Sequence, residues 1–134
     1  MEYSVIQKKK HELYCVKKTV VIGASPNPSR YSNRAMLELQ RHGHEVIGVG
    51  LRKGLVGDVN IEIDRVKIEG VDTVSLYVGP QHQESWIDYI LELNPKRVIL
   101  NPGTESNFIQ NALDRAGIPW EESCTLVLLT IGAY

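Results

Sequence analysis

One pattern repeats along the chain from Lys18 onward: a short apolar run, a cluster of Gly, Pro, Ser or Asn, and then an amphipathic helical stripe. The first apolar run, residues 19–22, is β-branched and uninterrupted, which is typical of a strand buried on both faces. Strands that alternate with helices pair in parallel through right-handed crossovers, and the helices cover both faces of the sheet. The pattern therefore predicts an α/β fold of the Rossmann type, a three-layer αβα sandwich.

The individual elements follow from the same periodicity and from Gly and Pro as stop signals. The predicted elements are strands at 19–22, 45–49, 71–78, 97–100 and, at an edge, 118–120, and helices at 32–43, 86–94 and 104–117. Residues 126–129 are apolar enough for a strand or a short terminal helix, of which the helix is favoured. Ser32 and Thr104 are the expected N-caps of two of these helices. Residues 51–70 predict a loop with one short extended piece.

Length and composition limit the organisation and the class of protein. A chain of 134 residues has room for one domain, which we expect over residues 18–134, after an N-terminal extension over 1–17 that is partly helical or flexible. The net charge of −1 gives no indication of nucleic acid or a membrane as partner. No segment has the pattern of a membrane span or a secretory signal, and the only cysteines are Cys15 and Cys124. We therefore expect a cytoplasmic protein with reduced thiols.

The ends of the four central strands carry turn residues: Gly23-Ala24-Ser25, Gly50-Leu51, Gly79-Pro80 and Asn101-Pro102-Gly103. Ordinary turn chemistry explains any one of these clusters. In an open parallel sheet, however, ligands bind beyond the carboxyl ends of the strands. Four such clusters at one edge therefore indicate a ligand pocket.

The segment from Gly23 to Pro26, followed by a helix, is the strongest local signal in the chain. Backbone N–H groups in such a turn, together with the positive end of the helix dipole, form an anion site. The glycine spacing of a dinucleotide fingerprint is absent, because Ser25 and Pro28 occupy the later positions. Arg30 could pair with a phosphate and Tyr31 could cover a base or ribose. The alternative is a solvent-exposed arginine beside a packed tyrosine.

The end of the second predicted strand distinguishes between cofactors. NAD-binding proteins place an acidic residue there, which bonds the 2′-hydroxyl of the ribose. This chain has Gly50-Leu51-Arg52-Lys53 instead. Two cations suit a phosphorylated ribose, as in the 3′-phosphate of coenzyme A or the 2′-phosphate of NADP. The alternative is that Arg52 and Lys53 belong to an ordinary solvated loop.

No catalytic arrangement emerges from the sequence. There is no Walker sequence and no nucleophile elbow, and none of the four histidines stands at metal-ligand spacing. His82, near the start of a predicted helix, could contact a ligand. We expect no metal site and no catalytic residue.

The residues that carry these signals resemble a known family. The stretch TVVIGASPNP at 19–28, followed by Arg30-Tyr31-Ser32, resembles the opening of the stand-alone CoA-binding domain proteins, which are similar to the N-terminal domain of the succinyl-CoA synthetase α subunit. Further similar stretches are GHEVI at 43–47, LNPGTE at 100–105, AGI at 116–118 and CTLV at 124–127. The resemblance covers about residues 12–134.

The resemblance implies a five-stranded parallel Rossmann sheet in the order 3-2-1-4-5 and coenzyme A as ligand. The positions that it implies for the ligand are Gly23, Ala24, Ser25 and Pro26 in the phosphate turn, Arg30, Tyr31 and Ser32 at the helix start, Lys53 after the second strand, and Val78, Gly79, Pro80, Asn101, Pro102 and Gly103 at the rims. The chain departs from the family at Gly50-Leu51, where many members have Asn-Pro. A ligase domain is not part of this sequence, so we do not expect acyl-CoA synthesis by it alone.

The sequence therefore predicts a CoA-binding module without catalysis of its own, which acts as a sensor, a carrier or a subunit. An alternative is an NADP-dependent enzyme or a nucleotide-sensing regulatory domain. Another is an interaction protein with a vestigial site and a homo-oligomeric surface. The expected partner is a small nucleotide ligand, with a homodimer or a protein partner left open.

Overall fold

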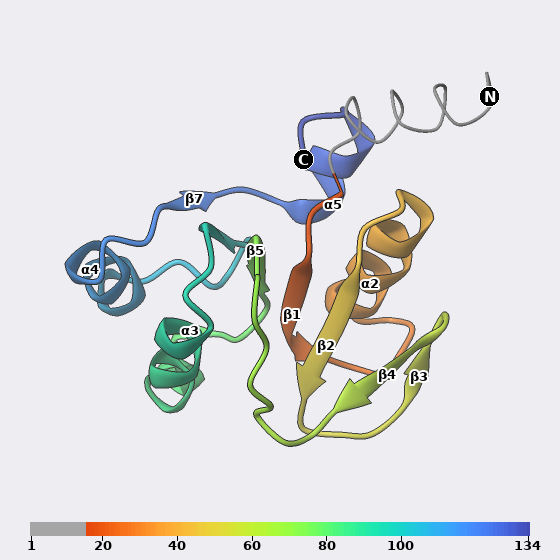
Figure 1. Cartoon of the computed structure of the whole chain (residues 1–134), viewed down its shortest axis with the longest axis horizontal. Helices are drawn as coiled ribbons and strands as arrows, with labels where there is room; N and C mark the ends of the chain where they lie inside the picture. Colours follow the sequence, from red (N-terminus) through yellow and green to blue (C-terminus); the bar gives the residue numbers. More distant parts are fainter. Residues whose placement is uncertain (1–15) are drawn as a thin grey trace.

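The computed structural model describes residues 16–134, which form an α/β sandwich (Figure 1). The predicted N-terminal extension over residues 1–17 lies outside the described residues except for its last two. The strands are β1 (Thr19–Ala24), β2 (Val46–Gly50), β3 (Leu55–Val56), β4 (Val59–Glu62), β5 (Thr73–Leu76), β6 (Arg97–Leu100) and β7 (Trp120–Glu122). The helices are α2 (Tyr31–Arg41), α3 (Ile87–Leu93), α4 (Asn107–Arg115), α5 (Thr125–Thr130) and the 3-10 helix η1 (Pro80–Ser85).

The sheet has seven strands in the order β3-β4-β2-β1-β5-β6-β7, so the expectation of five parallel strands was wrong. All neighbouring strands are parallel except β3 and β4, which form an antiparallel hairpin within the predicted loop 51–70. The strand predicted third, at 71–78, corresponds to β5. The order 3-2-1-4-5 requires it to pair with the second strand, but β5 pairs with β1, so the predicted order was wrong. The position beside β2 is taken by β4, where Ile61 pairs with Gly48.

A side-chain amide attaches this hairpin to the rest of the fold. Nε2 of Gln40, near the end of α2, donates to the main-chain oxygens of Met36 (3.1 Å) and Val56 (2.9 Å). Its Oε1 accepts from the N–H of Asp58 (3.0 Å), in the turn between β3 and β4. Gln40 therefore satisfies backbone groups that a two-residue strand leaves without a ladder partner.

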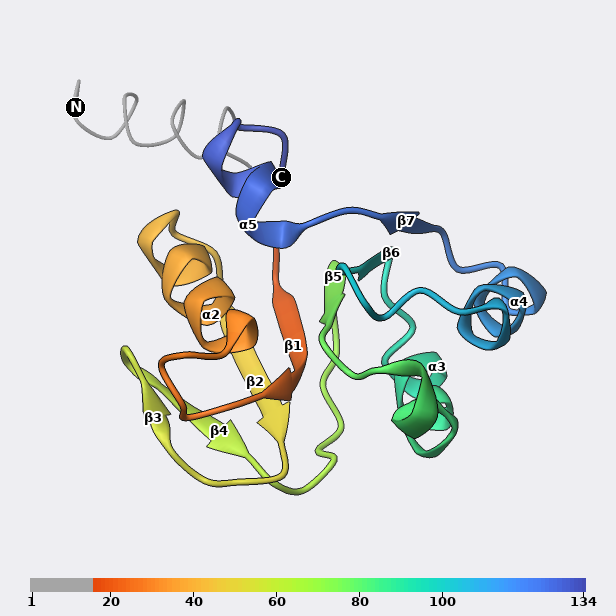
Figure 2. The same cartoon turned by 180° about the vertical axis from the view of Figure 1, so that it is seen from behind.

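The layers follow from the alternation of side chains along the buried strands. Val20 and Ile22 of β1 pack in the larger core with α3 and α4, whereas Val21 packs in the smaller core with α2 and α5. Figure 2 shows the two pairs of helices on opposite faces of the sheet. The predicted three-layer arrangement is therefore present. Within the described residues no helix is both long and apolar enough to cross a membrane.

Several helix ends differ from the sequence-based expectation. Ser32 does not cap α2: the N-cap is Arg30, without a side-chain cap, and Ser32 is buried in the first turn. The N-cap of α4 is Ser106, whose Oγ accepts from the N–H of Ile109 (3.1 Å), rather than Thr104. Thr104 instead closes a turn by donating its hydroxyl to the main-chain oxygen of Asn101 (2.8 Å).

The remaining elements lie close to their predicted positions. The strand expected at 118–120 forms at 120–122, and the terminal helix predicted at 126–129 is α5. The helix predicted from Trp86 begins one residue later as α3, and the 3-10 helix η1 precedes it. Pro80 opens η1, a position where the missing N–H of proline leaves no bond unmade.

Candidate functional site

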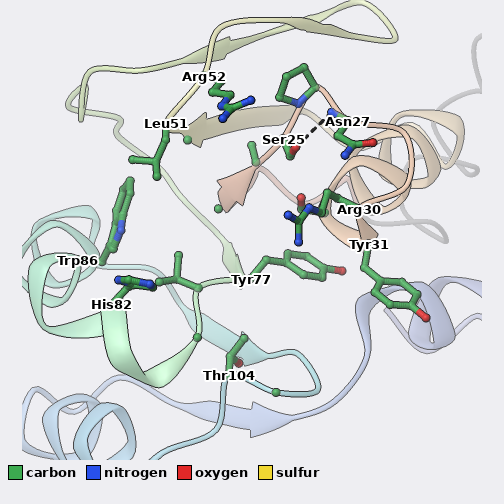
Figure 3. Close-up of a pocket in the computed structure, with 18 of the residues that line it drawn as sticks. Ser25, Asn27, Arg30, Tyr31, Leu51, Arg52, Tyr77, His82, Trp86 and Thr104 are labelled. Carbon is green, nitrogen blue, oxygen red and sulfur yellow. Dashed lines mark hydrogen bonds between the residues drawn. The ribbon is translucent and has the colours of Figure 1, made fainter.

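A pocket of about 740 Å³ lies at the carboxyl ends of β1, β2, β5 and β6 (Figure 3). Twelve of the fifteen predicted site residues line it: Gly23, Ala24, Ser25, Pro26, Arg30, Tyr31, Ser32, Arg52, Val78, Gly79, Pro102 and Gly103. The other three, Lys53, Pro80 and Asn101, do not. The structure thus brings together the four turn clusters that the sequence analysis placed at one edge of the sheet.

The carboxyl end of β1 combines a glycine in the left-handed region with a loop held by its own polar groups. Gly23 has φ +88°, and a Cβ there would lie 3.0 Å from the carbonyl carbon of Tyr77. Glycine is therefore needed because β1 approaches the backbone after β5 closely. Beyond it, the N–H of Asn27 donates to Oγ of Ser25 (3.1 Å), and Nδ2 of Asn33 donates to the main-chain oxygen of Ser25 (2.9 Å). These bonds fix the turn in shape before a ligand binds.

The turn leads directly into the N-terminus of α2, where Arg30, Tyr31 and Ser32 line the pocket. No side chain of the described residues caps this helix. Its first N–H groups and its dipole consequently face the pocket and favour a negative charge there. The turn and the helix N-terminus, which the sequence analysis predicted to form an anion site, thus lie together at the pocket.

The charged side chains that line the pocket have one sign. The lining includes Arg30, Arg52 and His82 but no Asp or Glu. Neither arginine side chain has a hydrogen bond or an ion pair with any residue between 16 and 134. Lys53, the position that the family resemblance singled out, is exposed outside the lining, so the cation at the end of β2 is Arg52.

The opposite wall comes from the segments after β5 and β6. Asn101 is buried there, but its side chain faces the interior: Nδ2 donates to Oγ of Ser75 (3.0 Å) and to the main-chain oxygen of Leu76 (2.9 Å), and Oδ1 accepts from the N–H of Thr125 (2.9 Å). Both hydrogens of the amide nitrogen and the amide oxygen are thus bonded within the fold. Asn101 shapes the wall and does not contribute its side chain to the pocket.

The backbone of this wall also favours negative charge. The carboxylate of Glu105 accepts from the N–H of Gly103 (3.0 Å). Hydrogen bonds from the backbone N–H groups of Glu105 itself, Gly103 and Thr104 lower the pKa of the Glu105 carboxyl. The N–H of Gly103 is therefore already bonded to a carboxylate of the chain itself.

The pocket also has apolar surfaces, which the sequence analysis did not assign to a site. Leu51, 87% exposed, and the buried Trp86 lie on one side of the pocket, and Tyr77 lies between them and Tyr31 (Figure 3). The guanidinium of Arg65 lies 3.9 Å from the centroid of the Trp86 ring. Burial raises the pKa of the Tyr77 hydroxyl, which has no hydrogen-bond partner among the described residues.

Four lining residues were given no role by the sequence analysis: Asn27, Tyr77, Trp86 and Thr104. Gly50 and Leu51 formed one of the predicted turn clusters and His82 was named as a ligand contact, although none of the three was among the fifteen predicted site residues. Trp86 fitted the apolar face of a helix, and that helical spacing gave no sign that part of its ring borders a pocket. The arrangement as a whole can hold a ligand that carries phosphates at one part and apolar groups at another.

Comparisons with known proteins bear on the family and the fold of this chain. A family profile described as a CoA binding domain matches residues 17–130. A crystal structure of an uncharacterized protein is 48% identical to this chain, with a TM-score of 0.86, and the match covers 90% of this chain and 99% of that one. No curated protein matches the sequence.

Two further solved structures share the fold at lower identity. A Thermus thermophilus protein, cell-free ID.343, is 23% identical with a TM-score of 0.79, over 96% of this chain and 98% of that one. A hypothetical protein from Pyrococcus horikoshii OT3 is 24% identical with a TM-score of 0.75, over 90% of this chain and 87% of that one. At this level of identity the likeness concerns the fold alone.

Proposed function

The chain belongs to the CoA-binding domain family, and from this premise we propose that its pocket binds coenzyme A, with the phosphates at the turn after β1. The observation that carries the proposal is a lining with two arginines, Arg30 and Arg52, and no acidic side chain, at the carboxyl edge of the sheet. The volume of about 740 Å³ lies within the range of ligand pockets.

The components of coenzyme A correspond to the components of the pocket. The pyrophosphate is assigned to the N–H groups of the Gly23–Ser25 turn and of the start of α2, with Arg30 as its cation. The 3′-phosphate is assigned to Arg52 at the end of β2. We assign no chemical step to the site, because the lining has no carboxylate and no imidazole other than His82 to act as general acid or base.

The test is calorimetric titration of the protein with CoA, dephospho-CoA, NADP and NAD. We expect CoA to bind more tightly than dephospho-CoA, because only CoA carries the 3′-phosphate. A protein that does not bind CoA would overturn the proposal, and tighter binding of NADP would replace coenzyme A by a dinucleotide.

Arg52 and Lys53 form a matched pair for this test, since they are adjacent cations and only Arg52 lines the pocket. We expect Arg52→Ala to weaken CoA binding by about 1.5–3 kcal/mol, the contribution of a charge-assisted hydrogen bond. Its affinity for dephospho-CoA should stay at the wild-type value. Lys53→Ala should leave both affinities unchanged. An equal effect of the two substitutions would mean that general positive charge, rather than a contact from Arg52, attracts the ligand.

A further inference from the structure

Gln83 is a polar residue that is almost completely enclosed, with 1% of its surface exposed. Nε2 of its side chain donates to the main-chain oxygen of Val78 (3.0 Å) and to that of Thr104. Its Oε1 accepts from the hydroxyl of Ser106 (2.6 Å), the N-cap of α4. The amide nitrogen thus donates two hydrogen bonds and the amide oxygen accepts one. Gln83 itself does not line the pocket.

These partners belong to two different walls of the pocket. Val78 follows β5 and Thr104 follows β6, and both residues line the pocket. The two segments are far apart in the sequence, and Gln83 joins them through one planar amide. Its neighbours in the chain also border the pocket: His82 precedes it, and the N–H of Trp86 donates to the main-chain oxygen of Gln83 (2.9 Å).

We propose that Gln83 is a positioning residue for the ligand site, which sets the spacing between the segment after β5 and the segment after β6. The planar amide fixes the spacing between the main-chain oxygens of Val78 and Thr104. Leaving a buried amide without hydrogen-bond partners would cost free energy, so this arrangement is the favoured one. A site held in shape before binding has less conformational entropy to lose when the ligand binds. Gln83 thereby contributes to affinity without touching the ligand.

This inference rests on the proposed function, because its main readout is the affinity for coenzyme A. The matched control is Gln40, which also donates to two main-chain oxygens and accepts one hydrogen bond. Gln40 lies near the end of α2, whereas the residues of α2 that line the pocket lie at its start. Removing either amide takes away three hydrogen bonds, and of the two side chains only that of Gln83 connects the pocket walls.

The experiment compares Gln83→Met, Gln40→Met and the wild type, each titrated with CoA at a temperature well below its unfolding midpoint. Both variants are expected to melt earlier than the wild type. Only Gln83→Met should bind CoA more weakly, by roughly tenfold, because only there is the preformed shape of the site lost. Wild-type affinity in Gln83→Met, or an equal loss in both variants, would overturn the inference.

A second measurement needs no ligand and separates this inference from the proposed function. Hydrogen exchange of the free proteins should show faster exchange at residues 78–79 and 103–104 in Gln83→Met and wild-type exchange at those residues in Gln40→Met. Unchanged exchange in Gln83→Met would overturn the positioning role whether or not CoA binds. Failure of the wild type to bind CoA, with the exchange result as expected, would overturn the proposed ligand and retain Gln83 as the residue that spaces the walls.

Discussion

At the amino ends of the strands, cationic side chains are surrounded by partners, whereas at the carboxyl ends they point into the pocket. Nε of Arg97, the first residue of β6, donates to Oγ1 of Thr73 (2.8 Å), and its two terminal nitrogens donate to the carboxylate of Glu121 (3.2 Å) and the main-chain oxygen of Tyr134 (2.9 Å). Its guanidinium carbon also lies 4.5 Å from the centroid of the Tyr134 ring. In contrast, Arg30 and Arg52 have no such partner between residues 16 and 134.

This difference separates two uses of the same residue type. A guanidinium that is half-buried among an acid, two oxygens and an aromatic ring contributes to stability, because its hydrogen bonds form on folding. A guanidinium that is exposed at the edge of a pocket contributes little to stability, since water solvates it in both the folded and the unfolded state. An exposed guanidinium is instead expected to contribute to the binding of an anion. The predictions below test this division between stabilising and binding groups, from the largest expected effect to the smallest.

The largest effect is expected at Gly23, which belongs to the carboxyl end but has a structural role. Gly23→Val combines a positive φ with a Cβ 3.0 Å from the Tyr77 carbonyl carbon. We expect a loss of about 3 kcal/mol in the free energy of unfolding, from backbone strain and from overpacking between β1 and the segment after β5. Chemical denaturation measures this loss.

Gly103 provides the control, because it has a similar φ of +91° but open space where its Cβ would stand. Gly103→Val should therefore cost about 1 kcal/mol, the conformational part alone. If the two variants lost equal stability, the close approach to Tyr77 would not be the reason for glycine at position 23. Gly23 would then have no structural role that sets it apart from the other residues at the carboxyl end of the sheet.

Substitution of Arg97 and of Arg30 tests whether the arginines at the two ends of the sheet have different roles. Arg97→Ala should lower the free energy of unfolding by about 2 kcal/mol, through the loss of bonds to charged and neutral partners, and leave CoA affinity unchanged. Arg30→Ala should change stability by no more than about 0.5 kcal/mol and weaken CoA binding by about 1.5 kcal/mol. Denaturation and calorimetry of both proteins give the four values.

The control for Arg30 is Arg41, on the last turn of the same helix, where it pairs with Glu38 at 2.7 Å and lies outside the pocket. Arg41→Ala should leave both quantities near wild type, since an exposed pair of this kind contributes little. A loss of CoA affinity in Arg97→Ala, with none in Arg30→Ala, would mean that CoA binds at the amino ends of the strands and not at the carboxyl ends.

The parts of the fold that were predicted correctly depend on local patterns. The apolar run of β1 and the helical faces around Met36 and Ile90 are readable from spacing, because burial of one face dictates the residue types at that period. The β3–β4 hairpin was missed, since two strands of two and four residues carry too little alternation to be distinguished from a loop.

The pocket illustrates the same limit at the level of single residues. The turn clusters were found because each one stands at the end of a recognisable strand. Arg52 and Lys53 could not be separated by sequence, because the path of an irregular loop decides which of two adjacent side chains faces the pocket. Trp86 could not be assigned, since its place at the pocket depends on segments that only the tertiary structure brings together.

The smallest effect is expected at His44, which lies with the partnered groups of the amino end. Its Nδ1 accepts from the N–H of Lys17 (3.0 Å), and its ring lies 4.8 Å from that of Tyr134. Burial, and then the charge of Lys17, lower the pKa of the imidazole below its usual value of 6.5, with further contributions in the same direction from His42 and Arg97 and an opposing one from Asp72.

Because the pKa of His44 is lower in the folded than in the unfolded state, the unfolded chain binds the proton first as the pH falls. The contribution of the neutral imidazole is therefore complete above pH 6.5 and is lost as the pH falls from 6.5 through the folded-state pKa. In His44→Asn, which keeps an acceptor near the Nδ1 position, the free energy of unfolding should fall less steeply over that window. Denaturation at a series of pH values measures the slope, and an NMR titration of the imidazole measures the pKa directly. A midpoint at or above 6.5, or a slope that the substitution does not change, would mean that neither the burial of the ring nor the cations of the amino end lower the pKa of this histidine.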